Sequence, residues 1–343
     1  MSAPRLSFIV PVHNTAPWLE RCLGSLLQND FADLEVVAID DGSTDGSLDI
    51  LLRRAAKDSR LKMQQHASQQ GLGRTRNTGL QAVSGETIGF VDSDDWIDIR
   101  VYRNLHERMT DTGADMGACS VRLEDPNGKR TGAWRMPDQL IPLDSAGNVQ
   151  AAYRILHDSC ANKLFRQELL ADLEFPRIYY EDGPFVIEAF CRAKSIVFVP
   201  DEGYHYITRP RSIMQSAPDS ARIQSAVESM ALAWESLSRR GIADRVRGRY
   251  DIRVRWLLRL AVVGLVGLER ETRDKLWKEV QTLVPPVWDD IMPFRAWERK
   301  LYLSLLRRPS PAPLARALKI TVDTAATFAQ WVNHVRYSSV KES

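Results

Sequence analysis

Three aspartates that follow an apolar run, Asp92, Asp94 and Asp95, are the residues of this sequence best suited to chemistry. Residues two apart in an extended chain point to the same side, so we expect Asp92 and Asp94 to direct oxygens to one point while Ser93 faces away. Such hard ligands suit Mg²⁺ or Mn²⁺, which phosphate oxygens and water usually help to hold. The segment predicts a divalent cation bound with a diphosphate ligand. The alternative is that these acids only cap a helix starting near Asp98.

A second acidic segment, Asp40-Asp41-Gly42-Ser43-Thr44-Asp45, follows a strand-like run. A carboxylate here is suited to accept a hydrogen bond from a base N–H, and Gly42 with the helix start after it supplies backbone donors. A tight turn with a helix cap explains Gly42 and Ser43 without any ligand. It leaves the two preceding acids unexplained, so both interpretations stay open.

The elements that must position these acids alternate between strand-like and helical patterns. We expect strands at 6–12, 34–39, 61–65 and 87–91. The first helix between them has an apolar face made of Leu19, Cys22, Leu23 and Leu26. The second helix, capped by Ser43-Thr44, has a face made of Leu48, Leu51, Leu52 and Ala55.

This order predicts an α/β fold, a mostly parallel sheet with flanking helices. Ligands bind beyond the carboxyl ends of the strands in such sheets. The polar segments 13–15, 40–45 and 92–95 follow three of the strands. We therefore expect them to converge at one edge.

The remaining chain predicts a hairpin and then a helical region. Asp125-Pro126-Asn127-Gly128 is typical of a turn between antiparallel strands, expected at 118–123 and 131–136. From about residue 217 the pattern changes to long amphipathic helices, so we predict a catalytic domain at 1–216 and a C-terminal helical domain at 217–343. Pro309-Ser310-Pro311-Ala312-Pro313 separates the last expected helix, 314–334, from the others.

The composition is that of a globular protein. The 343 residues are 44% hydrophobic, and the net charge of +2 gives no reason to expect a nucleic-acid partner. The four cysteines form no CxxC pair, which argues against a zinc site or a disulfide framework and fits the cytoplasm. We expect no secretory signal, because a strand-like run begins at residue 6. The longest apolar run, 261–268, is well below the roughly 20 residues of a spanning helix.

The C-terminal region is basic, with Arg307-Arg308 beside apolar residues. One hypothesis places it on an anionic membrane surface, within reach of a lipid-linked acceptor, which would make the protein peripheral on the inner face of the cell membrane. The other, which we favour, packs its apolar face on the catalytic domain or on a second subunit of a homo-oligomer.

Seven ordered motifs over about residues 6–215 resemble the family 2 glycosyltransferases, which have the GT-A fold, and their number and order make the resemblance specific. The motifs are Ile9-Val10-Pro11-Val12-His13-Asn14, Asp40-Asp41-Gly42-Ser43-Thr44-Asp45, 71–79 with Arg76-Asn77, Asp92-Ser93-Asp94-Asp95, Asn162-Lys163-Leu164-Phe165, Tyr180-Glu181-Asp182 and 206–212. The chain departs from the common pattern at His13, Thr75, Ala161 and Arg211. These departures bear on which donor sugar is used.

The resemblance implies a donor site for a nucleotide sugar, with UDP as the expected nucleotide. Asp92 and Asp94 match the DxD pair that binds Mn²⁺ or Mg²⁺ against the diphosphate, and Asp94 is the expected direct ligand. Asp41 would contact the uracil edge. The other residues implied to bind the donor are Pro11, Val12, Asn14, Arg76, Ser93, Arg209, Arg211 and Ser212.

The arginines among these residues need separate comment. Arg209 and Arg211 lie in the segment that closes over the donor, where guanidinium groups are suited to clamp phosphate oxygens. Arg76 has an equally supported alternative role, an ion pair with a structural acid.

The resemblance also implies a catalytic base at Glu181-Asp182, and we assign Asp182 to that role. Glu181 would orient or contact the acceptor. The alternative is that both acids only begin a helix, because acids and the nearby Pro184 favour first turns. His205 is a candidate third metal ligand, but an ordinary strand histidine is the favoured interpretation.

The resemblance thus implies a metal-dependent inverting glycosyltransferase that transfers a sugar to a hydroxyl of a bacterial capsule, O-antigen or wall polymer. Two rivals were weighed. A sugar nucleotidyltransferase would need a glycine-rich N-terminal loop, which Pro11-Val12-His13-Asn14 is not. A non-catalytic subunit that keeps the fold within a polysaccharide-synthesising complex is opposed by the intact acids at 92, 94 and 182.

Overall fold

The computed structural model describes residues 5–28, 31, 33–208, 220–243, 245–246, 265, 268–278, 281, 304 and 308–312. Contacts divide the chain into two compact units, Met1–Gln215 with Glu235–Val246, and Ser216–Trp234 with Arg247–Ser343. The first unit contains the sheet and every motif that the sequence singled out up to residue 208. The predicted helices at 314–334 and the basic segment around Arg307 lie outside the described residues, apart from isolated positions.

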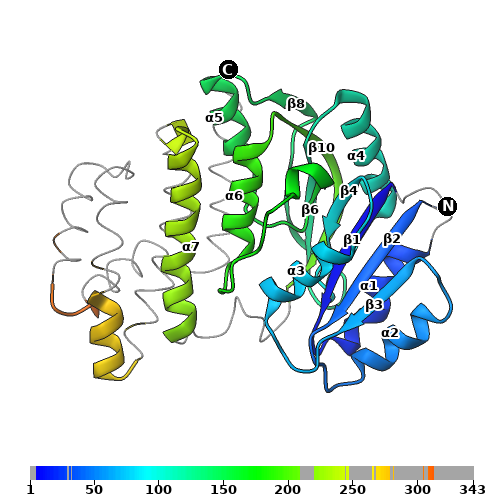
Figure 1. Ribbon diagram of the computed structural model, residues 1–343, viewed down its shortest axis with the longest axis horizontal. Helices are drawn as coiled ribbons and strands as arrows, with labels where there is room; N and C mark the ends of the chain where they lie inside the picture. The colour runs from blue at the N-terminus through cyan, green and yellow to red at the C-terminus, as the bar shows by residue number, and fades with distance from the viewer. Residues whose placement is uncertain are drawn as a thin grey trace. The chain divides into compact units, whose positions relative to one another are not determined.

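The first unit is built on a sheet in the order β3-β2-β1-β4-β9-β6-β10-β5, with β7 paired to β6 and β8 paired to β10 (Figure 1). The strands are β1 Leu6–Val12, β2 Leu34–Asp40, β3 Leu61–Gln65, β4 Thr87–Phe90, β5 Trp96–Ile97, β6 Met116–Glu124, β7 Arg130–Trp134, β8 Gln139–Pro142, β9 Lys163–Arg166 and β10 Ser195–Ile207. Strands β1 to β4 pair in parallel, and β6 pairs with β10 in parallel. Strand β9 runs antiparallel between β4 and β6. The predicted α/β fold with a mostly parallel sheet is confirmed.

Helices connect these strands. They are α1 Ala16–Leu27, α2 Ser47–Ala55, α3 Leu72–Ala82, α4 Ile99–Thr112, α5 Ala146–Ile155, the 3₁₀ helix η1 Gln167–Leu170, α6 Asp182–Arg192 and α7 Ser220–Arg239. In the part of the chain that the structure describes, no helix combines the length and the hydropathy needed to cross a membrane.

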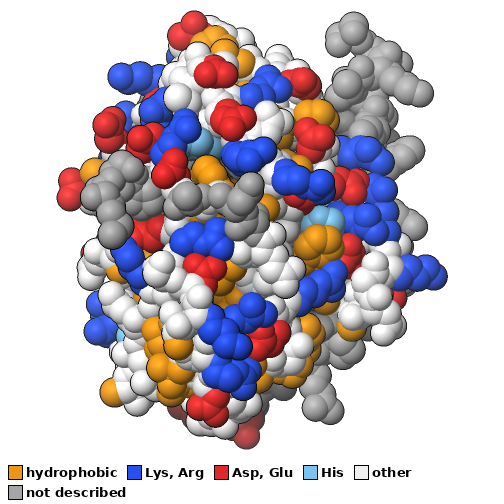
Figure 2. Space-filling view, turned by 90° about the vertical axis from the view of Figure 1, so that its right-hand side faces the viewer, with side chains coloured by type: hydrophobic (Ala, Val, Ile, Leu, Met, Phe, Trp, Pro, Cys, Tyr) orange, Lys and Arg blue, Asp and Glu red, His pale blue; other side chains and the backbone are white. Residues whose placement is uncertain are grey.

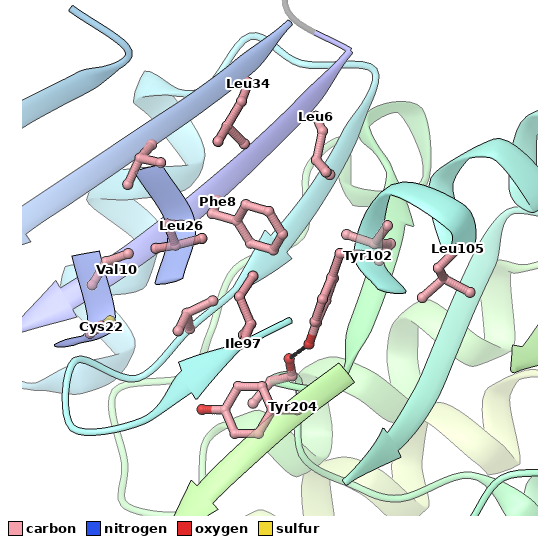
Figure 3. Close-up of a cluster of buried hydrophobic side chains, with 14 of the residues drawn as sticks. Leu6, Phe8, Val10, Cys22, Leu26, Leu34, Ile97, Tyr102, Leu105 and Tyr204 are labelled. Atoms are coloured by element: carbon pink, nitrogen blue, oxygen red, sulfur yellow. Dashed lines mark hydrogen bonds between the residues drawn. The ribbon is translucent and has the colours of Figure 1, made fainter. Parts of the chain in front are cut away.

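Helices α1 and α4 cover one face of the sheet. Alternate residues of β1 point to this face, and Figure 3 shows Phe8 close to Tyr102 of α4, with Cys22 and Leu26 of α1 beside the neighbouring β1 residues. The rings of Phe8 and Tyr102 meet edge to face, with centroids 5.2 Å apart. Tyr102 is completely buried, and its hydroxyl donates to the carbonyl of Ala161 at 2.7 Å. This hydrogen bond satisfies the one polar group that the ring brings into the core.

An aromatic cluster fills the other face, where α3 and α6 pack. Phe90 of β4 lies edge-on to Phe165, Phe175 and Phe185, and Phe175 stacks on Phe185 at 3.7 Å. Phe185 belongs to the first turn of α6. The cluster therefore fixes where α6 begins relative to the end of β4.

The predicted strands 6–12 and 61–65 are confirmed to the residue, and β2 and β4 differ from prediction by one residue at their ends. The predicted hairpin is also confirmed, because β6 and β7 pair antiparallel across a turn that the Asp125 carboxylate stabilises through the amides of Asn127 and Lys129. All four predicted core residues of the first helix are buried.

The prediction for the second helix was partly wrong. Helix α2 begins at Ser47 after Gly46, which has a positive φ of 92° and no side-chain cap, so Ser43-Thr44 do not cap it. Those two side chains contact the loop after β1 instead. Leu52, predicted to be in the core, is 52% exposed, while Ile50 packs against the core.

Helix α3 approaches β1 so closely that it needs a glycine. A Cβ added to Gly79 would overlap Ile9, whose side chain points to this face. We predict that Gly79→Ala lowers the free energy of unfolding by about 1–3 kcal/mol, because the added methyl group overpacks the helix–sheet interface. Urea denaturation followed by circular dichroism measures the change.

The matched control is Gly147→Ala in α5, where an added Cβ meets nothing within 4 Å. Because alanine is the better helix former, this variant should be neutral or gain up to about 1 kcal/mol. Equal losses in the two variants would contradict the packing explanation.

Candidate active site

The loops that follow β1, β2 and β4 are bonded to one another, as the strand order predicts. Asn14 lies in the left-handed region, with a φ of 52°. Its backbone N–H donates to the Ser43 hydroxyl at 3.1 Å, and its side-chain Oδ1 accepts the backbone N–H of Thr44 at 2.8 Å. Thr15 donates its hydroxyl to that of Ser93 at 2.9 Å. Asparagine tolerates this backbone conformation better than most residues. The predicted convergence of the three polar segments at one edge of the sheet is confirmed.

Asp41 is buried and orders the segment before α3. Its carboxylate accepts the amides of Gln70 and Gly71 at 2.8 and 2.9 Å, and it pairs with Nδ1 of His66 at 2.7 Å. Burial raises the pKa of Asp41, but these hydrogen bonds outweigh burial and bring its pKa below the ordinary value. An ionised carboxylate is thus fixed at the end of β2, where contact with a base stays a prediction. Pro11 and Val12, also assigned to the nucleotide site, are buried in β1 beside it.

The acidic segment after β4 is a tight turn, closed by a hydrogen bond from the amide of Asp95 to the carbonyl of Asp92 at 2.9 Å. The side chains alternate: Ser93 and Asp95 are buried, whereas Asp92 and Asp94 are partly exposed. The N-cap of the following helix α4 is Asp98, which accepts the amide of Arg100 at 3.0 Å. The hypothesis that residues 92–95 only cap this helix is therefore wrong.

Asp95 is a structural member of this turn. Its carboxylate accepts the Tyr204 hydroxyl at 2.6 Å and the amide of Ile207 at 2.7 Å, which ties the turn to the end of β10. Burial raises the pKa of Asp95 well above its ordinary value, and the charges of Asp94 and Asp92 raise it further. The three carboxylates therefore lie close enough to repel one another.

Asp92 and Asp94 fit a divalent cation by their chemistry. They are partly exposed carboxylates within one turn, and a bound cation would relieve their repulsion. Among the described residues, no group of three His, Cys, Asp or Glu is placed to hold a metal ion. Two protein carboxylates completed by phosphate oxygens and water are, however, the usual environment of Mg²⁺.

Arg76 of α3 connects this turn to the other acidic pair. Its Nη2 donates to Asp92 at 2.7 Å, its Nη1 donates to Glu181, and its side chain is only 3% exposed. The guanidinium lies over the ring of Phe175, 5.4 Å from its centroid. Of the two roles weighed from the sequence, the structure shows the ion pair with acids. Contact of Arg76 with a nucleotide stays a prediction.

Glu181 and Asp182 differ in accessibility. Tyr180, with a positive φ of 62°, turns the chain into α6, so that Glu181 is buried at 4% exposure while Asp182, the first helical residue, is partly exposed. Burial raises the pKa of Glu181 to about 7, with Arg76 opposing and Asp182 adding to the rise. Of the two acids, Asp182 is the one able to meet a substrate hydroxyl.

Lys163 was not among the predicted site residues, although it lies within the motif Asn162-Lys163-Leu164-Phe165. Lys163 is completely buried, and its Nζ donates to the carbonyl of Ser159 at 2.6 Å and to Oδ1 of Asn162 at 2.8 Å. Burial lowers its pKa to about 8, while the charges of Asp158 and Asp182 act to raise it. The sequence signal was a lysine next to the apolar pair Leu164-Phe165.

His205 has the structural role favoured from the sequence. Its ring stacks on Trp96 at 3.5 Å, and its Nδ1 lies 3.1 Å from a carboxylate oxygen of Glu124.

On the face of the molecule in Figure 2, basic and acidic side chains are interspersed. Arg209, Arg211 and Ser212, assigned to the donor site from the sequence, lie outside the described residues.

Comparison with known proteins identifies the fold and the family. Residues 7–174 match the family model described as "Glycosyl transferase family 2". The chain is 28% identical over 221 residues to the uncharacterized glycosyltransferase EpsJ of Bacillus subtilis, a match covering 62% of this chain and 63% of EpsJ. The chain thus aligns with less than two thirds of that relative's length.

Two solved structures share the fold. TarS residues 1–349 from Staphylococcus aureus, crystallised with UDP-GlcNAc, superposes with a TM-score of 0.69 at 23% identity, covering 92% of this chain and 91% of that one. The mannosyltransferase PcManGT from Pyrobaculum calidifontis, in complex with GDP-Man and Mn²⁺, gives a TM-score of 0.54 at 18% identity, covering 94% and 88%. The fold is that of the GT-A glycosyltransferases. Residues 7–174, just under half of the chain, thus match glycosyltransferase family 2, and the recognition of that family from the sequence is confirmed.

The buried ion pair between Arg76 and Glu181 yields a stability prediction. Arg76→Met should lower the free energy of unfolding by about 3–5 kcal/mol at pH 8, because it leaves a buried carboxylate without its partner. The loss should be smaller at pH 5.5, since protonation of Glu181 removes the unpaired charge. Urea denaturation at both pH values measures it.

Adding Glu181→Gln to Arg76→Met should recover part of the loss in a double-mutant cycle. Arg103→Met is the control, because Arg103 is 50% exposed and lies 3.9 Å from Glu107. A loss in Arg76→Met no greater than in this control would show that the buried pair is not holding the two segments together.

Proposed function

We propose that this protein is a metal-dependent inverting glycosyltransferase that transfers a sugar from a UDP-sugar to a hydroxyl group of a bacterial surface glycan. The observation that carries the proposal is the Arg76 bridge. It brings the Asp92 side of the DxD turn and the Glu181-Asp182 pair, which are distant in sequence, to one place. A donor diphosphate and an acceptor base are the two groups that such a transfer must bring together.

Two similar proteins, TarS and PcManGT, support the proposed donor, cofactor and setting. TarS is named as a poly(ribitol-phosphate) beta-N-acetylglucosaminyltransferase, and its structure holds UDP-GlcNAc. PcManGT is described with GDP-Man and Mn²⁺. We therefore propose a UDP-sugar as donor, Mn²⁺ or Mg²⁺ as cofactor, and a capsule, O-antigen or wall polymer as acceptor.

In the proposed reaction, Asp182 accepts the proton of the acceptor hydroxyl as its oxygen bonds to the anomeric carbon. The bond from that carbon to the diphosphate oxygen breaks, and UDP leaves with the electron pair. Attack from the face opposite UDP inverts the anomeric configuration. Glu181, held by Arg76, orients the acceptor side of the site. Asp41 contacts the base, and Pro11, Val12 and Asn14 line the nucleotide site.

Asp94, with Asp92, would hold the cation. When bound, the cation supplies Lewis-acid stabilisation of the charge that develops on the leaving diphosphate. Arg209, Arg211 and Ser212 are proposed to close over the donor phosphates. We assign these steps to a catalytic domain at 1–216, and we propose that the region 217–343 packs on another surface, either a second subunit or the inner face of the membrane.

Release of UDP from UDP-GlcNAc with Mn²⁺ tests the proposal, with other UDP-, GDP- and dTDP-sugars measured in parallel. Asp182→Asn should reduce turnover by about 10²–10⁴-fold and leave donor binding by calorimetry intact, because only the base is lost. Asp94→Ala should lose both turnover and metal-dependent donor binding. Asp111→Asn, an exposed residue of α4, is the matched control and should behave as the wild type.

A wild-type protein that binds and cleaves no donor with metal present would overturn the enzymatic proposal. It would favour the non-catalytic subunit weighed from the sequence. Turnover that needs no metal and persists in Asp94→Ala would show that the cation has no part in the mechanism. The proposal of a glycosyltransferase would still stand.

A further inference from the structure

Strand β9, whose Phe165 contacts Phe185 of α6, also contains a lysine that the proposed reaction does not use. Lys163 begins β9, is 0% exposed, and is charged at neutral pH unless its surroundings prevent it. Lysine is rarely buried completely without a carboxylate partner. Its Nζ donates instead to the backbone carbonyl of Ser159 and to the amide oxygen of Asn162, at 2.6 and 2.8 Å. This placement calls for a physical explanation.

The first part of that explanation is a chain of hydrogen bonds that fixes the loop 157–160. Asn162 is itself fixed, because its Nδ2 donates to the carbonyl of Cys119 in β6 at 2.6 Å. Ser159 donates its amide to Nδ1 of His157 at 3.1 Å, and the His157 ring stacks on Trp134 at 3.9 Å. Lys163 therefore connects β6 to a loop that has no regular secondary structure of its own.

The second part is electrostatic. Lys163 and Phe165 lie two residues apart on β9 and so share a face of the sheet, and Phe165 contacts Phe185, which follows Asp182 by one helical turn in α6, with ring centroids 6.0 Å apart. The charges that act on Lys163 are those of Asp158 in the loop 157–160 and of Asp182. The thiols of Cys160 and Cys119 carry no charge at neutral pH, because burial raises the pKa of each. Asp182 also acts on Arg76, and it raises the pKa of its neighbour Glu181. Because coupling between two titrating groups is reciprocal, a positive charge on Lys163 favours the ionised form of Asp182.

We propose that Lys163 is a positioning residue of the transfer site, which fixes the loop 157–160 beside Asp182 and favours the ionised carboxylate that acts as the base. The catalytic consequence of this proposal rests on the proposed function, whereas the coupling between the side chains of Lys163 and Asp182 does not. A general base must be ionised before it can accept a proton, so a buried cation beside it extends activity to lower pH.

The coupling is tested without any activity. We expect the Lys163 side chain, followed by its ¹³Cε chemical shift in labelled full-length protein, to titrate well below the ordinary lysine range. In Asp182→Asn, which removes the negative charge, the midpoint should fall further, by about 1 pH unit. Asp111→Asn should leave it unchanged. The same midpoint in wild type and Asp182→Asn would overturn the proposal, whether or not the protein is an enzyme.

The catalytic consequence is tested by the pH dependence of UDP release from UDP-GlcNAc with Mn²⁺. Lys163→Met should move the acidic limb of kcat/KM upward by about 1 pH unit, because Asp182 then ionises less readily. Lys163→Gln keeps a hydrogen-bond donor but no charge. It should restore the stability lost in Lys163→Met while keeping the shifted limb. The exposed Lys194→Met should change neither quantity.

The outcomes separate the possibilities. If Lys163→Met and Lys163→Gln lose stability but keep the wild-type pH profile, the lysine has a purely structural role and the proposal is wrong. If Lys163→Met fails to fold, the pH profile of Lys163→Gln tests the proposal alone: a shifted acidic limb supports it, and a wild-type limb contradicts it. If the wild type releases no UDP, the proposed function has failed. The chemical-shift titration then remains as the test of the coupling between Lys163 and Asp182.

Discussion

A single buried guanidinium determines how the candidate site is assembled. Arg76 is 3% exposed, and a charge so far from water must be paired. Its partners, Asp92 and Glu181, lie 16 and 105 residues away in the sequence. The ion pairs therefore require that the end of β4 and the start of α6 meet at α3. Gly73 in the first turn of α3 permits this approach, because a Cβ there would lie only 2.6 Å from the carbonyl oxygen of Pro176 and 3.3 Å from the side chain of Glu181.

The parts of the fold that were predictable are those set by local pattern. Strand-like runs that alternate with helical patterns placed β1 and β3 to the residue, since both strands pair with sequence neighbours in a βαβ order. The insertion of β9 between β4 and β6 was not predictable in this way. It depends on pairing between segments far apart in the chain, and its four residues, Lys163-Leu164-Phe165-Arg166, are too few to carry a period that specifies a neighbour.

Residue types located the site, but they did not reveal its pairings. The acids after the end of β4 predicted a polar turn at this edge of the sheet, although the sequence also allowed these acids to cap a helix. We predicted that Ser43 and Thr44 cap a helix, which is the local role that serine and threonine favour. In the structure they form hydrogen bonds with Asn14, which lies in a different loop. The burial of Lys163 was equally invisible, because lysine is mostly exposed and burial is a property of the folded chain.

The charge balance of this edge explains why the pieces belong together. Among the described residues, Arg76 interacts with three acids, Asp92, Glu181 and Asp182, and Asp94 and Asp95 lie in the same turn as Asp92, so carboxylates outnumber the cationic side chains at this edge. Protonation relieves part of this excess, since burial raises the pKa of both Asp95 and Glu181. Asp92 and Asp94 are more exposed than these two acids, and their carboxylates alone would repel an anionic diphosphate. In the proposed mechanism a divalent cation would reverse that sign, so the same carboxylates that repel a bare diphosphate would favour one that arrives with its metal.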